Sequence, residues 1–195
     1  MILPILAYGD AILRKAGEEI TANYPGLREL IANMFETMYE ANGVGLAAPQ
    51  VGKSIRLFIV DASPFADDKD DDDQPIPESA ALKDFKKIFI NARIVEEKGE
   101  EWKFNEGCLS IPKIREDVLR KPKLRIQYYD ENFNFFDEQY EGTAARIVQH
   151  EYDHIEGKLF TDRINPLRKR LLKGKLLDIS RGKIEVKYKM KFPNR

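Results

Sequence analysis

Hydrophobic residues recur at helical spacing in three stretches of the chain, and each stretch predicts an amphipathic helix. The first runs from about Pro25 to Ala41 and stops at Asn42-Gly43. The second runs from about Gly142 to Ile155, and the third is a basic helix near residues 167–176. The apolar positions that define them are Leu27, Leu30, Ile31, Met34 and Met38, then Ala144, Ala145, Ile147, Val148 and Ile155, then Leu167, Leu171, Leu172 and Leu176.

Shorter apolar runs and alternating patterns predict strands between and after these helices. Residues 56–60 form a run typical of a buried strand, and residues 133–140 are expected to pair with residues 124–128 through a turn at Glu131-Asn132. The tail alternates apolar and polar residues from Ile184 to Phe192, which predicts a half-exposed strand. Further strand signals lie at residues 88–90 and 94–95, before a turn at Gly99, and residues 1–20 form an extended arm that turns at Tyr8-Gly9-Asp10 and is anchored by Ile12 and Leu13.

Composition and charge narrow the class of protein. The 195 residues fit one domain, and 43% hydrophobic with 33% charged residues is ordinary for a soluble globular chain. A net charge of -1 gives no reason to expect nucleic acid as the main ligand, and one cysteine cannot form an internal disulfide. The apolar start of the chain is broken by Pro4 and lacks a basic segment, and no stretch is long enough to span a membrane. We therefore expect a cytoplasmic protein with no membrane role.

An acidic segment interrupts the chain at residues 63–79. Six aspartates lie between Pro64 and Pro75, without the spaced ligands, turn glycine and closing glutamate of a calcium loop. The segment therefore reads as a solvated surface insertion.

The helix predicted at residues 142–155 carries the strongest chemical signal. His150 and His154, the only histidines of the chain, are four residues apart and therefore project from one helix face. Two imidazoles so placed can bind one metal ion, and Glu151 between them can act as general base on a metal-bound water. The lone Cys108 is the natural third ligand, because a thiolate binds transition metals strongly and a Cys-His-His set leaves a position open. A buried free cysteine is the alternative for Cys108.

Three ordered motifs resemble the signature motifs of the peptide deformylases. They are Gly43-Val44-Gly45-Leu46-Ala47-Ala48-Pro49-Gln50, Glu106-Gly107-Cys108-Leu109-Ser110 and Gln149-His150-Glu151-Tyr152-Asp153-His154. With the arm and the first helix, the resemblance extends to about Arg163, whereas the acidic insertion and the C-terminal extension 164–195 carry no family signature.

The resemblance implies removal of the formyl group from N-formylmethionyl nascent peptides, with release of formate. It implies that Cys108, His150 and His154 bind one divalent metal ion per chain, Fe²⁺ natively, with Zn²⁺, Ni²⁺ or Co²⁺ as substitutes. Glu151 would be the general base, and the Gln50 amide and the Leu109 backbone N–H would stabilise the oxyanion.

Other residues near these motifs are candidates for binding the substrate. The backbone of Val44, Gly45 and Leu46 offers an edge to which a peptide could pair as an added strand. The methionine side chain needs an apolar pocket, and Gly107 would leave room beside the metal. Candidate walls are Val44, Phe104 and Ile147, and Glu106 with Asp153 is expected to fix Arg120 or Arg115.

Arg146 departs from the expectation of an apolar pocket residue one turn before His150. Its guanidinium could border the substrate pocket and alter the side-chain preference, or extend away to solvent. The motifs leave both placements open.

Three alternatives to a deformylase deserve comparison. A zinc peptidase shares the His-Glu-x-x-His motif but usually takes its third ligand downstream, where Glu156 is too close. A structural metal module needs four protein ligands, which the one cysteine and two histidines do not supply. A ribosome-binding protein could use the basic cluster of residues 168–175, which also makes the ribosome near its exit tunnel a candidate partner of a deformylase.

The fold class that we predict is α+β. A single domain over residues 1–195 places antiparallel and mixed sheets around the metal-binding helix of residues 142–155, and a C-terminal helix and strand follow.

Overall fold

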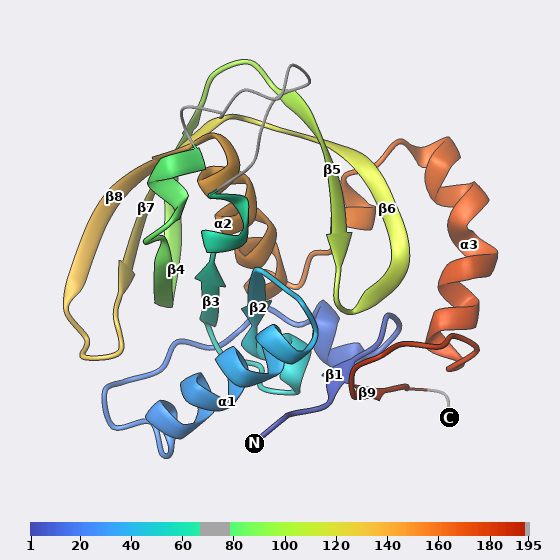
Figure 1. Ribbon diagram of the computed structural model, residues 1–195, viewed down its shortest axis with the longest axis horizontal. Coiled ribbons are helices and arrows are strands. Elements are labelled where there is room, and N and C mark those ends of the chain that lie inside the picture. The colour runs from blue at the N-terminus through green and yellow to red at the C-terminus, as the bar shows by residue number, and fades with distance from the viewer. Residues whose placement is uncertain (67–78, 194–195) are drawn as a thin grey trace.

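The computed structural model describes residues 1–66 and 79–193, and within them an α+β domain surrounds one central helix (Figure 1). This helix, α2, spans Gly142–Ile155, the same bounds as the sequence predicts. It packs against strands of a sheet on one side, while its polar face is turned toward a β-hairpin. The predicted fold class is confirmed.

The described residues form a five-stranded antiparallel sheet in the order β2-β3-β4-β7-β8. The central part of the sheet is hydrophobic because every residue of β3 is buried. The predicted pair of β7 and β8 forms with Tyr129 opposite Phe135, and two separate strand signals merge into the long β4, which has two register shifts. The strands are β2 (Gly45–Ala47), β3 (Leu57–Asp61), β4 (Lys86–Lys98), β7 (Lys123–Tyr129) and β8 (Phe135–Glu141).

A second antiparallel pair, β5 (Trp102–Cys108) and β6 (Ile111–Arg120), makes the hairpin that faces α2. Residues 111–120 alternate between buried and exposed positions and form a strand that is not predicted from the sequence. Cys108 lies opposite Ile111 at the closed end of this hairpin, after a register shift at Gly107. The hairpin therefore brings the Cys108 segment to the polar face of α2.

Two further helices flank this core. α1 spans Leu27–Glu40, within two residues of its predicted ends, and its buried Met34 and Met38 are core residues as expected. α3 spans Pro166–Ser180 and is capped at its N-terminus by Asn165, whose side chain accepts a hydrogen bond from the Leu167 N–H. Short 3-10 helices cover Ala11–Arg14, Ala48–Val51, Ser63–Phe65, Ser79–Leu82 and Phe160–Asp162.

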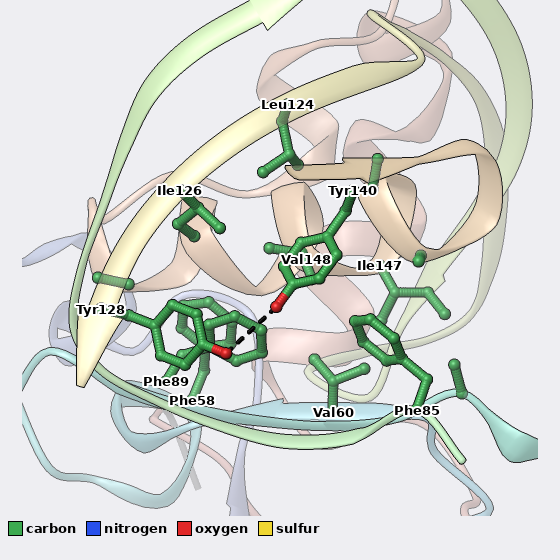
Figure 2. Close-up of a cluster of buried hydrophobic side chains, with 14 of the residues drawn as sticks. Phe58, Val60, Phe85, Phe89, Leu124, Ile126, Tyr128, Tyr140, Ile147 and Val148 are labelled. Carbon is green, nitrogen blue, oxygen red and sulfur yellow. Dashed lines mark hydrogen bonds between the residues drawn. The ribbon is translucent and has the colours of Figure 1, made fainter. Parts of the chain in front are cut away.

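The largest hydrophobic cluster lies between the five-stranded sheet and α2 (Figure 2). Phe58 and Phe89 stack with ring centroids 4.6 Å apart, and Tyr128 packs on Phe89. The hydroxyls of Tyr128 and Tyr140 are 3.2 Å apart, so these two large residues bury their rings without leaving their oxygens unpartnered. Ile147 and Val148 of α2 complete the cluster and fix the rotation of the helix.

The C-terminal tail differs from its prediction. The expected strand from Ile184 to Phe192 is reduced to β9, Met190–Lys191, which pairs in parallel with β1, Ile5–Leu6. Burial still alternates along the tail, as the pattern predicts. The strand is short because its partner among the described residues is the two-residue arm strand rather than a sheet. The arm turns as expected at Gly9, where φ is +98°, and Leu13 anchors it.

The aspartates of the predicted acidic insertion lie outside the described residues. No helix in residues 1–66 and 79–193 is long and apolar enough to cross a membrane.

Candidate metal centre and active-site pocket

Cys108, His150 and His154 come together between the hairpin and α2. Their ligand atoms all lie within 4.8 Å of one another, and Cys108 Sγ is 3.3 Å from His154 Nε2. Thiolate and imidazole ligands of one tetrahedral zinc or iron ion, bound at about 2.0–2.3 Å, are separated by distances of this order. Burial lowers the pKa of His154 to about 3, so its ring is neutral and its nitrogen lone pair is free to bind a metal. The donor set therefore fits a divalent transition metal.

Glu106 orients the His150 ring from behind. Its Oε2 is 2.9 Å from His150 Nδ1, which leaves Nε2 facing the cluster. Burial would raise the pKa of the Glu106 carboxyl, but hydrogen bonds from Arg120 and His150 hold it well below its usual range. The ionised carboxylate therefore fixes the His150 tautomer with a proton on Nδ1, as metal-binding histidines require.

Arg120 links Glu106 to Asp153, which lies between His150 and His154 on α2. Both ion pairs are buried, with N–O distances of 2.7 Å, and Arg163 adds a second partner for Asp153. This confirms the expected pairing for Arg120. The alternative partner, Arg115, instead bonds Asn105 at the surface.

Arg146 is buried and does not extend to solvent. Its exposed fraction is 2%, and its guanidinium donates to Glu106 Oε1 at 2.9 Å and to the Trp102 carbonyl at 2.7 Å. It also lies 4.6 Å from the centroid of the Trp102 ring and 5.6 Å from that of Phe104. Because Arg146 also lines the pocket described below, the placement beside the pocket is confirmed and the solvent placement is wrong.

The amide nitrogen of Gln50 points toward the three candidate metal ligands, next to Cys108. The Ala47 N–H donates to Gln50 Oε1 at 2.8 Å, which fixes the side chain. Gln50 Nε2 then lies 3.5 Å from Cys108 Sγ and donates to Ser110 Oγ at 3.2 Å. An N–H donor is thereby aimed at the space beside the cysteine.

Glu151 lies on the same side, against the backbone of β2. It is 4% exposed, and its Oε2 has no hydrogen-bond partner among the described residues. Burial raises the pKa of its carboxyl to about 7, so it can exchange a proton near neutral pH. A Cβ on Gly45 would be only 2.4 Å from Glu151 Oε1, so it is this carboxylate that needs a glycine in β2.

A pocket of about 980 Å³ opens onto the cluster. Val44, Phe104 and Ile147, the three predicted wall residues, all line it. Leu109 and the tail residues Val186 and Tyr188 form another part of its lining. Gly45, Gln50, Glu106, Gly107, Cys108, Arg115, His150 and Glu151 also line it.

Leu46 and Gly107, two further residues expected near the substrate, have distinct surroundings. Leu46 is fully buried in the core, and of the three residues expected to offer a backbone edge only Val44 and Gly45 are among those that line the pocket. A Cβ on Gly107 would lie 2.9 Å from the Arg115 guanidinium, so Arg115 packs closely against this glycine. Within the described residues β2 is an edge strand of the five-stranded sheet, as a substrate that pairs as an added strand would require.

Sequence reasoning misses two residues at this site. Ser110 accepts the Gln50 hydrogen bond, and the Tyr188 hydroxyl donates to the Leu109 carbonyl at 2.7 Å. Ser110 stands inside a recognised motif but has no role assigned there. Tyr188 lies on the apolar side of the alternating tail, a pattern that predicts burial but not contact with the hairpin.

Comparison with known proteins adds a family to this geometry. A family model described as polypeptide deformylase matches residues 2–170. The peptide deformylase of Flavobacterium psychrophilum is 62% identical over 191 residues, covering 98% of this chain and 97% of the relative. That of Christiangramia forsetii is 59% identical over 194 residues, covering 100% of this chain and 97% of the relative.

Solved structures agree with the sequence comparisons. A crystal structure of a peptide deformylase from Legionella pneumophila superposes with a TM-score of 0.76 at 36% identity, covering 94% of this chain and 98% of the other. Its similarity extends over almost the whole chain, so the fold and the family agree.

Proposed function

Because the chain belongs to the polypeptide deformylase family, we propose that its active site is the metal centre of Cys108, His150 and His154. The chain is a metal-dependent hydrolase that removes the N-formyl group from nascent polypeptides. The observation that carries the site assignment is the convergence of a base, an amide donor and an apolar pocket on these three ligands. Membership of the polypeptide deformylase family excludes the zinc peptidase and the structural metal module as alternatives.

The bound metal would supply Lewis-acid chemistry, acidifying a water and polarising the formyl oxygen. The chain supplies the hydrogen-bond donors around the reacting carbon. Gln50 Nε2 and the backbone N–H of Leu109 would donate to the oxyanion that develops as the formyl carbon becomes tetrahedral. The Ala47 N–H holds the Gln50 amide in the donating orientation before substrate arrives, so little reorganisation is needed.

Glu151 would move the proton. Its carboxylate takes a proton from the attacking water and passes it to the amine of the departing peptide, so that formate and a free N-terminus result. The backbone of Gly45 packs against the Glu151 carboxylate and restricts its movement. Burial raises the proton affinity of Glu151 relative to an exposed glutamate.

The substrate would bind as an extended peptide. Its methionine side chain would contact the apolar walls of Val44, Phe104 and Ile147, and its backbone would pair with the outer edge of β2 at Gly45. Arg115 and Glu106 are polar residues that line the same pocket, and the bound peptide would lie next to them. Arg146 backs the aromatic wall from behind.

The metal in the cell is proposed to be Fe²⁺. A thiolate and two imidazoles suit iron and zinc alike, and Zn²⁺, Ni²⁺ or Co²⁺ would be accepted by the same ligands. A ferrous thiolate centre should lose activity in air, whereas a zinc-loaded centre should not.

We place this reaction in the cytoplasm, beside the ribosome that supplies nascent chains. The basic face of α3 supports a contact there, because Arg170, Lys173 and Lys175 are exposed. Arg168 and Lys169 are less available, since they pair with Glu116 and Asp162. Co-sedimentation of ribosomes with wild type and with Lys173→Glu/Lys175→Glu tests this contact, and equal binding by both would refute it.

Formate release from formyl-Met-Ala-Ser tests the site assignment. Protein purified without oxygen and analysed for metal should turn over, and Glu151→Gln should retain its metal but lose about 100-fold or more in kcat. Gln50→Ala should lose about 10²-fold with metal retained, because it removes one donor to the oxyanion. Full activity in Glu151→Gln with metal bound would overturn the assignment of the base.

A further inference from the structure

The turn that follows Cys108 is held by two distant parts of the chain. The Tyr188 hydroxyl donates to the carbonyl of Leu109 at 2.7 Å, and the backbone N–H of Tyr8 donates to the carbonyl of Ser110 at 2.8 Å. Consecutive carbonyls of the turn are thus bound by the C-terminal tail and by the N-terminal arm. The turn lies at the closed end of the β5–β6 hairpin.

The tail and the arm are themselves joined, so these two contacts form one support. The backbone N–H of Ile5 donates to the Lys189 carbonyl and that of Ala7 donates to the Lys191 carbonyl, both at 2.9 Å. These hydrogen bonds join the paired strands β1 and β9 (Figure 1). Tyr188 packs against the hydrophobic cluster that includes the buried face of α1. Ile184 and Met190, on either side of it along the tail, pack against the cluster that includes the buried face of α3. Tyr188 is therefore anchored on both sides.

The same tail forms one wall of the active-site pocket. Residues 185–188 line it, together with His150 and Glu151 of α2. The family model ends at residue 170, so this wall comes from a part of the chain that lies outside the matched region.

We propose that Tyr188 is a positioning residue for deformylation, which acts by fixing the Leu109–Ser110 peptide group and, through the Leu109 Cα, the adjacent peptide group whose N–H stabilises the oxyanion. The inference rests on the proposed role of the Leu109 N–H. That N–H and the Leu109 carbonyl belong to adjacent peptide groups joined through one Cα, so the bond from Tyr188 restrains ψ of Leu109 and limits the swing of the N–H. A donor that is fixed before the reaction stabilises the oxyanion better than one that must reorient.

The test is Tyr188→Phe, which removes only the hydroxyl and keeps the aromatic ring in the pocket wall. We expect kcat for formyl-Met-Ala-Ser to fall about tenfold, less than the roughly 10²-fold expected for losing an oxyanion donor itself. KM should stay within about twofold, because the ring that faces the substrate is unchanged. Metal content should also stay at the wild-type value, since no ligand is altered.

The matched control is Tyr39→Phe. Its hydroxyl also donates one partly buried hydrogen bond, to Asp61 at 2.6 Å, but it lies on α1 outside the pocket lining. Both variants should lower the melting temperature by a similar few degrees. Only Tyr188→Phe should lower kcat.

A second readout is independent of turnover. In zinc-loaded, ¹⁵N-labelled protein the amide resonance of Leu109 should shift and exchange faster with solvent in Tyr188→Phe, and should be unchanged in Tyr39→Phe. An unchanged Leu109 amide, an unchanged kcat, or a rise in KM alone would each overturn the positioning role. An inactive wild-type enzyme would instead refute the proposed function, and the amide measurement would still decide whether Tyr188 holds Leu109.

Discussion

Replacing Gly45 with alanine should disable the enzyme without touching a metal ligand. A Cβ built at this position lies 2.4 Å from Glu151 Oε1 and 2.7 Å from its Cδ and Cγ. Ordinary contact begins at 3.4 Å, so the Glu151 carboxylate has to move by about 1 Å. The backbone of Gly45 does not have a positive φ, so alanine is compatible with the strand and the clash falls on the carboxylate alone.

Glu151 cannot accommodate this shift cheaply because it is 4% exposed and held on a fully packed helix. A misplacement of this size costs about 10²-fold in rate for a catalytic group. The extra methyl should also lower the free energy of unfolding by about 1–3 kcal/mol through overpacking. We therefore expect kcat to fall about 100-fold, with the metal retained.

Anaerobic formate-release assays and metal analysis of Gly45→Ala measure these effects. Gly174→Ala is the control, because a Cβ in that helix meets no atom within 4 Å among the described residues. It should raise the free energy of unfolding by about 0.5–1 kcal/mol and leave turnover unchanged. Turnover of Gly45→Ala within about threefold of wild type would refute the placement of Glu151 against β2.

Three further predictions concern the surroundings of the site. Arg146→Met should lower the free energy of unfolding of metal-free protein by about 3 kcal/mol in urea, because Glu106 and two carbonyls lose a buried donor, and a loss below about 1 kcal/mol would contradict those contacts. Cys108→Ser should weaken zinc binding at least about 100-fold in a competition with a chromophoric chelator, and unchanged affinity would exclude the thiolate as a ligand. Burial opposes the charge of Asp162. Hydrogen bonds from Arg14 and Lys169 nevertheless hold the pKa of this carboxyl at about 2, below the unfolded value of about 3.9. The stability that this carboxylate adds is thus present above about pH 4 and lost as the pH falls toward about 2, so the difference in unfolding free energy between wild type and Asp162→Asn should shrink over that interval.

The sequence predicts the parts of this protein that local periodicity and short motifs encode. The bounds of α2 follow from its apolar spacing, and the face shared by His150 and His154 follows from the helical repeat. The third ligand, Cys108, could be selected because thiol chemistry is scarce in the chain, and the structure brings it to 3.3 Å from His154. Such inferences need no knowledge of distant contacts.

Contacts between distant segments are where the sequence gives least. The tail pattern from Ile184 to Phe192 predicts alternating burial but not its partner, so a regular strand was expected where only Met190–Lys191 pairs. Similarly, the glycine at position 45 signals a close approach, but a ligand and a side chain of the protein itself are equally compatible with it. Only the packing of α2 against β2 shows that Glu151 is the group that approaches.

Arg146 is the clearest case of a position that the helix periodicity locates but whose partners it cannot name. One turn before His150, it has to share the face of the metal site, and a buried guanidinium there requires acceptors. Those acceptors are the Trp102 carbonyl and Glu106 of β5 and the Val118 carbonyl of β6. One guanidinium thus supports both the carboxylate behind His150 and the aromatic wall at Phe104. It follows that the substrate pocket and the metal centre are not independent, and a change in the aromatic wall that alters side-chain preference should also alter metal affinity through Glu106.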